Sequence, residues 1–382
     1  MYFQFTEDQK MIRDMARKFA REVVAPKAAE LDEKSEFPAM HLQKMWELGL
    51  MSMMVDPKYG GSGMDSLSYV LALEEISWAC ASTAVTMSVN NSLFCGPVQK
   101  FGTEEQKQEF LVPCATGKAL GAYCLSEPGT GSDAANQQTT AILVGNDYVL
   151  NGTKNFITNG PNAENFIIFA MTDKAKRHKG ISAFLVKKSD FGFSVGKVEK
   201  KLGIRASSTS SIVLTDCRIP KSRLLGAEGQ GFMLAMTTLD AGRIGIATQA
   251  LGISQAAFDY AIKYAGEREA FGQTIDNFQA IQFMLSDMST RIEASRLLTY
   301  KAAWLKDQGI SCSREAAQAK LFSSETSNFV TNKAVQIHGG YGYCREYPVE
   351  RLLRDARITE IYEGTSEIQR VVIAKNLLKE RG

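Results

Sequence analysis

Apolar residues recur every three or four positions in the first third of the chain. This spacing begins at a capping box from Thr6 to Gln9 and predicts a helix to about residue 33, which Pro26 kinks or ends. The same criteria predict further helices at about 38–48, 65–79, 82–101 and 104–115, the last behind a capping box that begins at Thr103. The pattern therefore predicts an all-helical domain over residues 1–118.

Near residue 119 the pattern changes to short apolar runs bounded by Gly, Asn, Asp and Pro. The runs that favour strands lie at 122–125, 139–144, 148–150, 166–171, 181–186, 193–198 and 212–215. Gly145 and Asn146 separate two of them in the manner of a two-residue hairpin. We expect an antiparallel, β-barrel-like domain over residues 119–228.

Helical spacing returns at Gly231 and continues to the C-terminus. It predicts long segments at about 231–267, 276–308, 313–337 and 348–379. Four helices of such length form a bundle, so residues 229–382 are predicted to be a four-helix-bundle domain. The fold class is α+β multidomain, in the order all-α, β, all-α.

The last helical segment is interrupted at a carboxylate, Glu363, followed by Gly364. Glycine permits backbone geometry that other residues resist, and Ser366 with Gln369 forms a capping-box pattern that could open the next helix. With Ile361 and Tyr362 before it, the Glu363 carboxyl can lie in an apolar pocket that raises its pKa toward that of a useful base. The alternative is a solvated helix end with a glycine cap.

Composition excludes several function classes. Apolar residues make up 45% of the chain and charged residues 23%, with a net charge of +2 and no dense Lys/Arg block, so we expect no nucleic-acid partner. No run approaches about 18 apolar residues and no leader pattern is visible, which favours a cytoplasmic protein without membrane insertion. Seven cysteines without a C-x-x-C pair and three distant histidines predict no metal site, no disulfide framework and no Ser-His-Asp triad.

A glycine-rich stretch, 129–134, matches the G-x-G-x-x-G/A dinucleotide fingerprint. That match would favour an NAD-dependent Rossmann dehydrogenase, but the fingerprint needs a helix after the loop, and residues 137–144 favour a strand. Two readings remain: a plain turn between strands, or a loop whose N–H groups and hydroxyls, Ser126 and Ser132, meet a flavin and a phosphorylated ligand.

Four separated motifs carry a resemblance to a known family. They are Tyr123–Asp133, Phe156–Gly160, Gln336–Gly342 and Tyr362–Arg370. In this order, they are similar to the motifs of the acyl-CoA dehydrogenases, flavoenzymes that desaturate acyl-CoA thioesters. The segments Ile204–Thr209 and Leu239–Ile246 resemble short-chain (butyryl-CoA) members most. A non-enzymatic helical scaffold would leave these motifs unexplained.

The resemblance implies a reaction and a base. Butyryl-CoA would be converted to crotonyl-CoA as Glu363 takes the α-proton and the β-hydrogen leaves as hydride to N5 of FAD. A minority of the family, including isovaleryl-CoA dehydrogenases, place the base near Gly242, where this chain has a glycine that cannot serve. An acyl-CoA of another length or a branched one is the alternative substrate.

The resemblance also implies binding residues. Acyl-CoA would be contacted by Ser132, Asp240, Arg243, Tyr362 and Gly364. FAD would be contacted by Tyr123, Leu125, Ser126, Gly131, Ser132, Phe156, Ile157, Thr158, Arg268, Phe271, Gln279, Gln336, Gly339, Gly340, Thr365 and Glu367. Phe156 stands where many members have Trp or Tyr, which could alter contact with the electron acceptor. His338 is assigned no catalytic role.

Partners follow from the same resemblance. Arg268, Phe271, Gln336, Gly339 and Gly340 correspond to residues that reach the flavin of a neighbouring subunit, so a homotetramer is expected. Reoxidation is expected from electron-transferring flavoprotein. The alternative role is the flavoprotein subunit of an electron-bifurcating complex.

Overall fold

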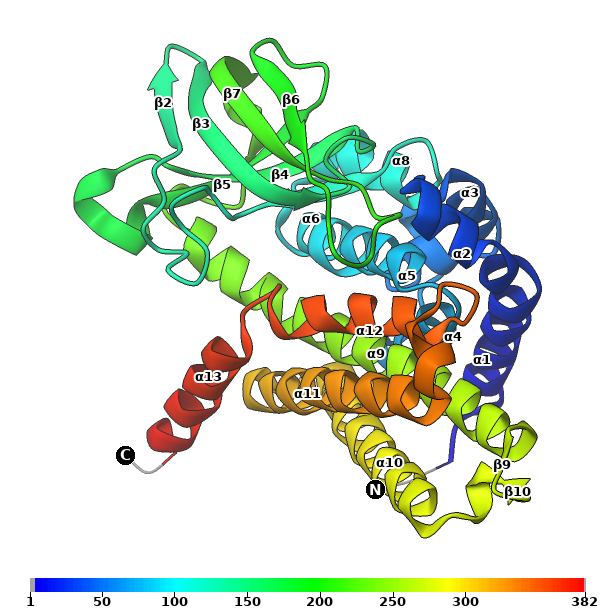
Figure 1. The fold of residues 1–382 in the computed structure, drawn as a ribbon. Helices are drawn as coiled ribbons and strands as arrows, with labels where there is room; N and C mark the ends of the chain where they lie inside the picture. Colours follow the sequence, from blue (N-terminus) through cyan, green and yellow to red (C-terminus); the bar gives the residue numbers. More distant parts are fainter. Residues whose placement is uncertain (1–3, 381–382) are drawn as a thin grey trace.

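A computed structural model describes residues 4–380 of the chain (Figure 1). Its N-terminal part is helical, as predicted, and both capping boxes, at Thr6 and Thr103, are formed. The helices are α1 (Glu7–Phe19), α2 (Ala25–Lys34), α3 (Ala39–Glu47), α4 (Ser66–Ala79), α5 (Ala81–Ser88), α6 (Gly96–Phe101), α7 (Glu104–Gln106) and α8 (Val112–Ala115).

Three π turns, each just ahead of a proline, join these helices into longer ones. They span Ala20–Val24, Val89–Cys95 and Lys107–Leu111. Pro26, Pro97 and Pro113 lie in the first turn of the helix that follows each of them. Proline lacks an N–H and its ring presses on the preceding turn, and a wider π turn accommodates both effects. Pro26 therefore ends the first helical part, as the sequence predicts.

The middle part is one eight-stranded sheet. Its strands are β1 (Gly121–Cys124), β2 (Thr140–Val144), β3 (Asp147–Thr158), β4 (Asn165–Met171), β5 (Ile181–Lys187), β6 (Phe193–Val198), β7 (Thr209–Pro220) and β8 (Leu224–Leu225). They pair in the order β6-β7-β3-β2-β4-β5-β8, with β1 beside β4. Most pairs are antiparallel as predicted, but β1 and β2 run parallel to β4. The predicted hairpin joins β2 to β3 at Gly145, φ 64°.

Two strands are much longer than the sequence predicts. The pairing of β3 with β7 shifts register between Leu150 and Gly152 and again between Lys154 and Ile157. Each bulge breaks the alternation of buried and exposed positions, so only fragments of both strands carry a strand pattern. The loop at 129–134 leads to β2 without a helix, which excludes a βαβ dinucleotide unit there.

As far as residue 380, the C-terminal part contains five α-helices rather than four. They are α9 (Gly231–Glu267), α10 (Gln279–Asp307), α11 (Ser313–His338), α12 (Val349–Arg357) and α13 (Ser366–Lys379), and a small hairpin, β9 (Glu269–Ala270) with β10 (Gln273–Thr274), follows α9. The predicted fourth helix is divided into α12 and α13 at the break near Glu363. Figure 1 shows α9 passing from the sheet to the β9–β10 hairpin, and α13 at the edge of the bundle, where it packs against α11.

The predicted capping box at the start of α13 is wrong. Thr365 is the N-cap, with its backbone extended and its Oγ1 accepting from Ile368 N at 3.4 Å. The Gln369 side chain turns back to the preceding loop and donates to the carbonyl of Gly364 at 2.8 Å. Serine is the stronger capping residue and Ser366, unlike Thr365, has a glutamine three positions later, so pattern alone placed the cap one residue late.

Two features are absent from residues 4–380. None of the helices there is long and apolar enough to cross a membrane. The same residues contain no group of three or more His, Cys, Asp or Glu side chains placed to hold a metal ion.

Candidate active site

A left-handed turn aims Glu363 away from the helical path. Glu363 has φ 51° and Gly364 has φ 92°. A non-glycine residue in this region costs about 1–2 kcal/mol, so neighbouring contacts must hold the turn. Although Glu363 is half-buried as a residue, its Oε2 atom is enclosed and has no hydrogen-bond partner within residues 4–380. The carboxylate thus keeps an open acceptor at the break between α12 and α13.

Space for this carboxylate is made by a glycine on α9. A Cβ built on Gly242 would lie 2.1 Å from Glu363 Oε2 and 2.9 Å from Leu93 Cδ2. A Cβ at this distance would force the Glu363 carboxyl to move, so the observed position of the carboxyl requires glycine here. Gly242 therefore cannot carry a base, and its missing side chain admits the carboxyl of Glu363.

Burial and nearby cations act on Glu363 in opposite directions. Burial raises the pKa of Glu363 to about 7, while the positive charges of Lys320 and Arg243 lower it. Arg243 pairs with Asp240 at 2.5 Å, and Asp240 also accepts from Ser313 at 3.0 Å. A carboxyl group with a pKa near 7 can act as a general base at neutral pH.

Tyrosine side chains form part of the wall around Glu363. The Tyr362 hydroxyl donates to Gln249 Oε1, and Gln249 in turn donates to the Ala81 carbonyl at 2.8 Å. The Tyr123 hydroxyl is enclosed without a partner in the described chain, and burial raises the pKa of both phenols, which stay neutral. Ile361, expected to help form the pocket, is 47% exposed because it lies on the outer side of the turn.

A second group of predicted residues gathers where β3 meets β7 and the loop after β1. The Ser126 carbonyl accepts from Asn155 N at 2.8 Å, and Thr158 pairs with Thr209 across the two strands. The bulge gives Phe156 φ 56° and leaves its ring 65% exposed, whereas Ile157 is buried. Leu125 is half-buried, and Gly131 and Ser132 are exposed on the same loop.

The polar atoms of this region suit a large polar ligand. Several are enclosed yet have no hydrogen-bond partner within residues 4–380: Thr130 Oγ1, Asn159 Oδ1, Ser207 Oγ, Ser208 Oγ and Ser210 Oγ. Buried hydroxyl and amide groups normally have partners, so an unpaired set marks a place where a ligand with hydrogen-bonding edges fits. A flavin has such edges, and the residues present fit it.

A buried ion pair holds the loop that carries Ser126 and Ser132. Lys154 Nζ lies 2.8 Å from Glu127 Oε1 and 3.0 Å from Gln137 Oε1, and both charged side chains are almost fully buried. Glu127 also accepts the backbone N–H groups of Gln138 and Thr139 at 2.6 and 3.0 Å. The loop is therefore tied at both ends to β3.

A third group of predicted residues lies at the other end of α9. A cavity of about 390 Å³ brings together Arg268, Gly339 and Gly340 with Tyr264 and Tyr341. Gly339, φ 60°, is the C-cap of α11. Phe271, Gln279 and Gln336 are exposed nearby and do not line this cavity. In Figure 1 this end of the bundle lies away from the start of α13, so one chain does not unite this group with Glu363.

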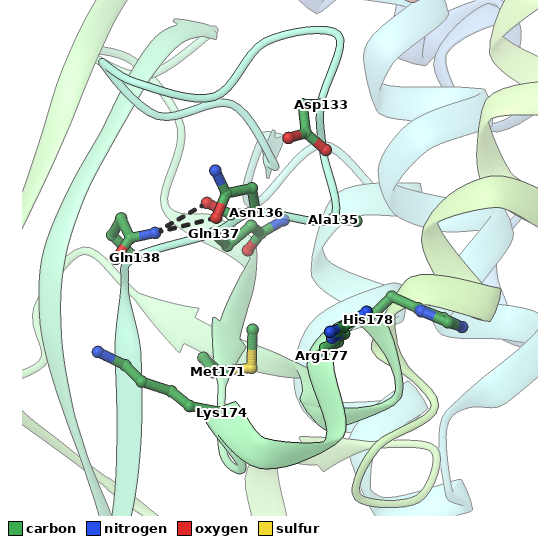
Figure 2. A pocket seen from close by; sticks show the side chains of 9 residues that line it. All are labelled: Asp133, Ala135, Asn136, Gln137, Gln138, Met171, Lys174, Arg177 and His178. Atoms are coloured by element: carbon green, nitrogen blue, oxygen red, sulfur yellow. Dashed lines mark hydrogen bonds between the residues drawn. The ribbon is translucent and has the colours of Figure 1, made fainter.

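Another cavity, of about 400 Å³, lies beside the Ser132 loop (Figure 2). Asp133 and Asn136 contribute to it from the loop, and Lys174, Arg177 and His178 from the segment after β4. Nothing in the pattern of the sequence indicates that these basic residues face a loop about forty residues earlier.

The remaining predicted residues are at the start of α13. Thr365 is its N-cap, and Glu367 is exposed in the first turn. Three residues that contribute to the sites were missed by the sequence analysis: Lys320, Gln249 and Lys154. Each lies on a helix or strand where its polar side chain looks solvent-facing, and only packing against distant segments reveals its burial.

The fold and the buried glutamate define a class of enzymes. The chain belongs to the acyl-CoA dehydrogenase family, oxidoreductases that act on CH–CH groups: the family's N-terminal, middle and C-terminal domain models match residues 6–118, 122–217 and 229–378. Members of this family are flavoproteins.

Particular relatives cover the whole length of the chain. The short-chain specific acyl-CoA dehydrogenase of Clostridium acetobutylicum is 51% identical, over 99% of this chain and 100% of its own. Butyryl-CoA dehydrogenase from Megasphaera elsdenii has a similar structure, with a TM-score of 0.97 and 46% identity over 99% and 100% of the two chains. A chain solved in work on the electron transferring flavoprotein of Acidaminococcus fermentans and flavin-based electron bifurcation gives a TM-score of 0.98 and 50% identity, over 99% and 100%.

Proposed function

We propose that this chain converts a short-chain acyl-CoA, butyryl-CoA, to the 2-enoyl thioester, crotonyl-CoA, with Glu363 as the base. The observation that carries the proposal is the Glu363 carboxylate: its Oε2 is enclosed, has no partner in the described chain, and has a pKa of about 7. Because the α C–H of a thioester is a weak acid, the base must be desolvated and fixed in place.

The chain's own groups would perform distinct tasks. Glu363 Oε2 would receive the α-proton, and Lys320 and Arg243 would keep enough of the carboxyl ionised at neutral pH. The backbone N–H of the left-handed turn would face the thioester oxygen as charge develops there. FAD, when bound, would supply the acceptor for the β-hydrogen.

The FAD site would be formed by the β1–β3–β7 region. The exposed ring of Phe156 and the Thr158 hydroxyl would lie against the flavin ring system, with Ser126 and Ser132 at its polar edges. Support comes from the unpaired, enclosed hydroxyl groups on the neighbouring strand. The predicted residues Tyr123, Leu125, Gly131 and Ile157 belong to the same region.

The acyl-CoA thioester would extend from Glu363 past Asp240 and Arg243. Lys174 and Arg177, in the cavity beside the Ser132 loop, suit its phosphate groups. The Arg268 cavity would contact FAD bound to a neighbouring subunit, since it is remote from Glu363 within one chain. A homotetramer, domain boundaries at 118 and 228, a cytoplasmic location and reoxidation by electron-transferring flavoprotein stay predictions.

The substrate proposal is tested by kcat/KM with C4, C8 and C16 acyl-CoA thioesters. Support comes from the short-chain relatives over the full length of the chain. We expect C4 to be used best, by at least about tenfold, as one methylene in a fitted pocket is worth roughly 1–3 kcal/mol. A preference for C8 or longer would overturn the short-chain proposal and leave the base assignment intact.

A second candidate role is the dehydrogenase component of an electron-bifurcating complex. The similarity to a chain from the bifurcation work favours it. Stable co-purification with an electron-transferring flavoprotein at physiological salt would support this role. A partner that dissociates during gel filtration would instead indicate ordinary, transient electron transfer.

A further inference from the structure

Lys320, on α11, is a fully buried lysine with a single side-chain hydrogen bond within residues 4–380. Its side chain is 0% exposed, and its Nζ donates to the carbonyl of Gly364 at 2.7 Å. No carboxylate in residues 4–380 lies within 4.0 Å of this nitrogen. Burying an ammonium group is costly unless something specific compensates for it, so its place beside the turn of the base needs an explanation.

The carbonyl that Lys320 binds belongs to the residue after the base. Gln369 Nε2 donates to the same oxygen at 2.8 Å and to the Glu363 carbonyl at 3.3 Å. The two donors hold both carbonyls of a turn whose residues have left-handed φ values. Without these bonds, the turn could relax toward ordinary helical geometry and move the carboxyl of Glu363.

Lys320 is also the stronger of two cations acting on Glu363. The ionisable groups that face this carboxyl come from α11, α9, α4, β1 and the turn itself: Lys320, Arg243, Tyr69, Tyr123 and Tyr362. Those that face Lys320 are Glu363, Arg243, Glu360 and Glu367. The charge of Arg243 is partly neutralised by Asp240, whereas in the described part of the chain Lys320 has no paired carboxylate at contact distance. The Lys320 effect on Glu363 is accordingly the larger one.

We propose that Lys320 is a positioning residue for the base: its ammonium group holds the turn that carries Glu363 and places a positive charge beside the carboxyl. This inference rests on the proposed function of Glu363. It assigns to one side chain both the geometry and the protonation of the base.

Two variants test the two contributions together. Lys320→Met removes the charge and the hydrogen bond at similar volume, whereas Lys320→Arg keeps a cationic donor. Lys188→Met is the matched control, because Lys188 also donates to a backbone carbonyl, that of Pro161 at 2.8 Å, but on an exposed part of the middle domain. The rate of flavin bleaching by butyryl-CoA is measured against pH, and urea unfolding reports the stability of each variant.

We expect Lys320→Met to lower the plateau rate about tenfold and to move the acidic limb of the profile up by about 1 pH unit, since a nearby cation favours the charged carboxyl. Lys320→Arg should leave the limb within about 0.3 pH unit of the parent. An unmoved limb in Lys320→Met, or an equal shift in Lys188→Met, would overturn the proposal.

An infrared titration of the Glu363 carboxyl, identified by its loss in Glu363→Gln, provides a readout independent of turnover. A rise in its midpoint in Lys320→Met supports the proposal, and an unchanged midpoint overturns it. If the parent is not bleached by any acyl-CoA, the proposed function fails, while the infrared midpoint still decides whether Lys320 controls Glu363. If Lys320→Met does not fold, the midpoint in Lys320→Gln decides in the same way.

Discussion

At Glu363, desolvation of a carboxyl group opposes its interaction with two cations, and desolvation dominates. The pKa of about 7 in the folded protein lies above the ordinary value of 4.5. A group with a raised pKa contributes stability that is present below pH 4.5 and is lost as the pH rises through 7. When the Glu363 carboxyl is ionised, its burial therefore destabilises the folded protein.

Glu363→Gln should stabilise the protein most at high pH. The uncharged amide does not ionise, so the variant retains the stability that the parent loses when its buried carboxyl ionises. We therefore expect the free energy of unfolding to rise by about 2–3 kcal/mol at pH 8 and by much less at pH 5. Urea unfolding at both pH values measures the difference. Glu360→Gln on the same loop is the control, and an equal gain at the two pH values would contradict the raised pKa.

Gly242→Ala tests the space reserved for the carboxyl. The new Cβ would meet Glu363 Oε2 at 2.1 Å and push it aside, so we expect turnover to fall by about 100-fold. Gly266→Ala, on the same helix with Asp276 Oδ2 at 3.7 Å, has room and should retain the parent rate. Steady-state kinetics of the two variants decides, and a fast Gly242→Ala enzyme would mean that Glu363 does not occupy this position during the reaction.

The roles of some single residues can be predicted from the sequence, and those of others cannot. Glu363 and its left-handed turn were predictable because a Glu-Gly step interrupts a helical pattern next to a family motif. Lys320 was not predictable, because a lysine among alanines on α11 has the local pattern of a solvated position. Its burial depends on the packing of α11 against the turn between α12 and α13, which no window of the sequence contains.

Among the elements, the loop from β1 to β2 depends on a buried ion pair. Lys154→Met would leave Glu127 buried without its partner, and we expect a loss of about 3–5 kcal/mol in the free energy of unfolding, with weakened FAD retention. Lys27→Met breaks the exposed Lys27–Glu30 pair, which solvent screens, and should leave the free energy of unfolding nearly unchanged. A Lys154→Met protein with parent stability and full flavin content would show that the pair does not hold the loop.

Element boundaries were predictable where a local signal fixes them. Thr6, Thr103 and Pro26 placed helix starts and a break correctly, because caps and prolines act through neighbouring backbone groups. The full lengths of β3 and β7 were not predictable, since bulges interrupt their alternation. Their pairing depends on residues some sixty positions apart.

At the scale of the whole molecule, two groups of residues matched to FAD lie at opposite ends of α9. The β1–β3–β7 region is near Glu363, and the Arg268 cavity is at the β9–β10 hairpin (Figure 1). The order of domains was predictable from the change in hydrophobic period. The hydrophobic pattern of one chain does not predict how two chains would bring the β1–β3–β7 region of one next to the Arg268 cavity of the other.

An anaerobic titration with butyryl-CoA tests the central claim, that Glu363 is the base of a flavin-dependent dehydrogenation, most directly. The purified parent and Glu363→Gln, matched for flavin content, are titrated while flavin absorbance is followed. We predict prompt bleaching of the parent and a rate at least about 1,000-fold lower in the variant, since a positioned base contributes about 10²–10⁴-fold. Equal bleaching of both proteins, or an oxidised parent with every acyl-CoA tried, would contradict the account.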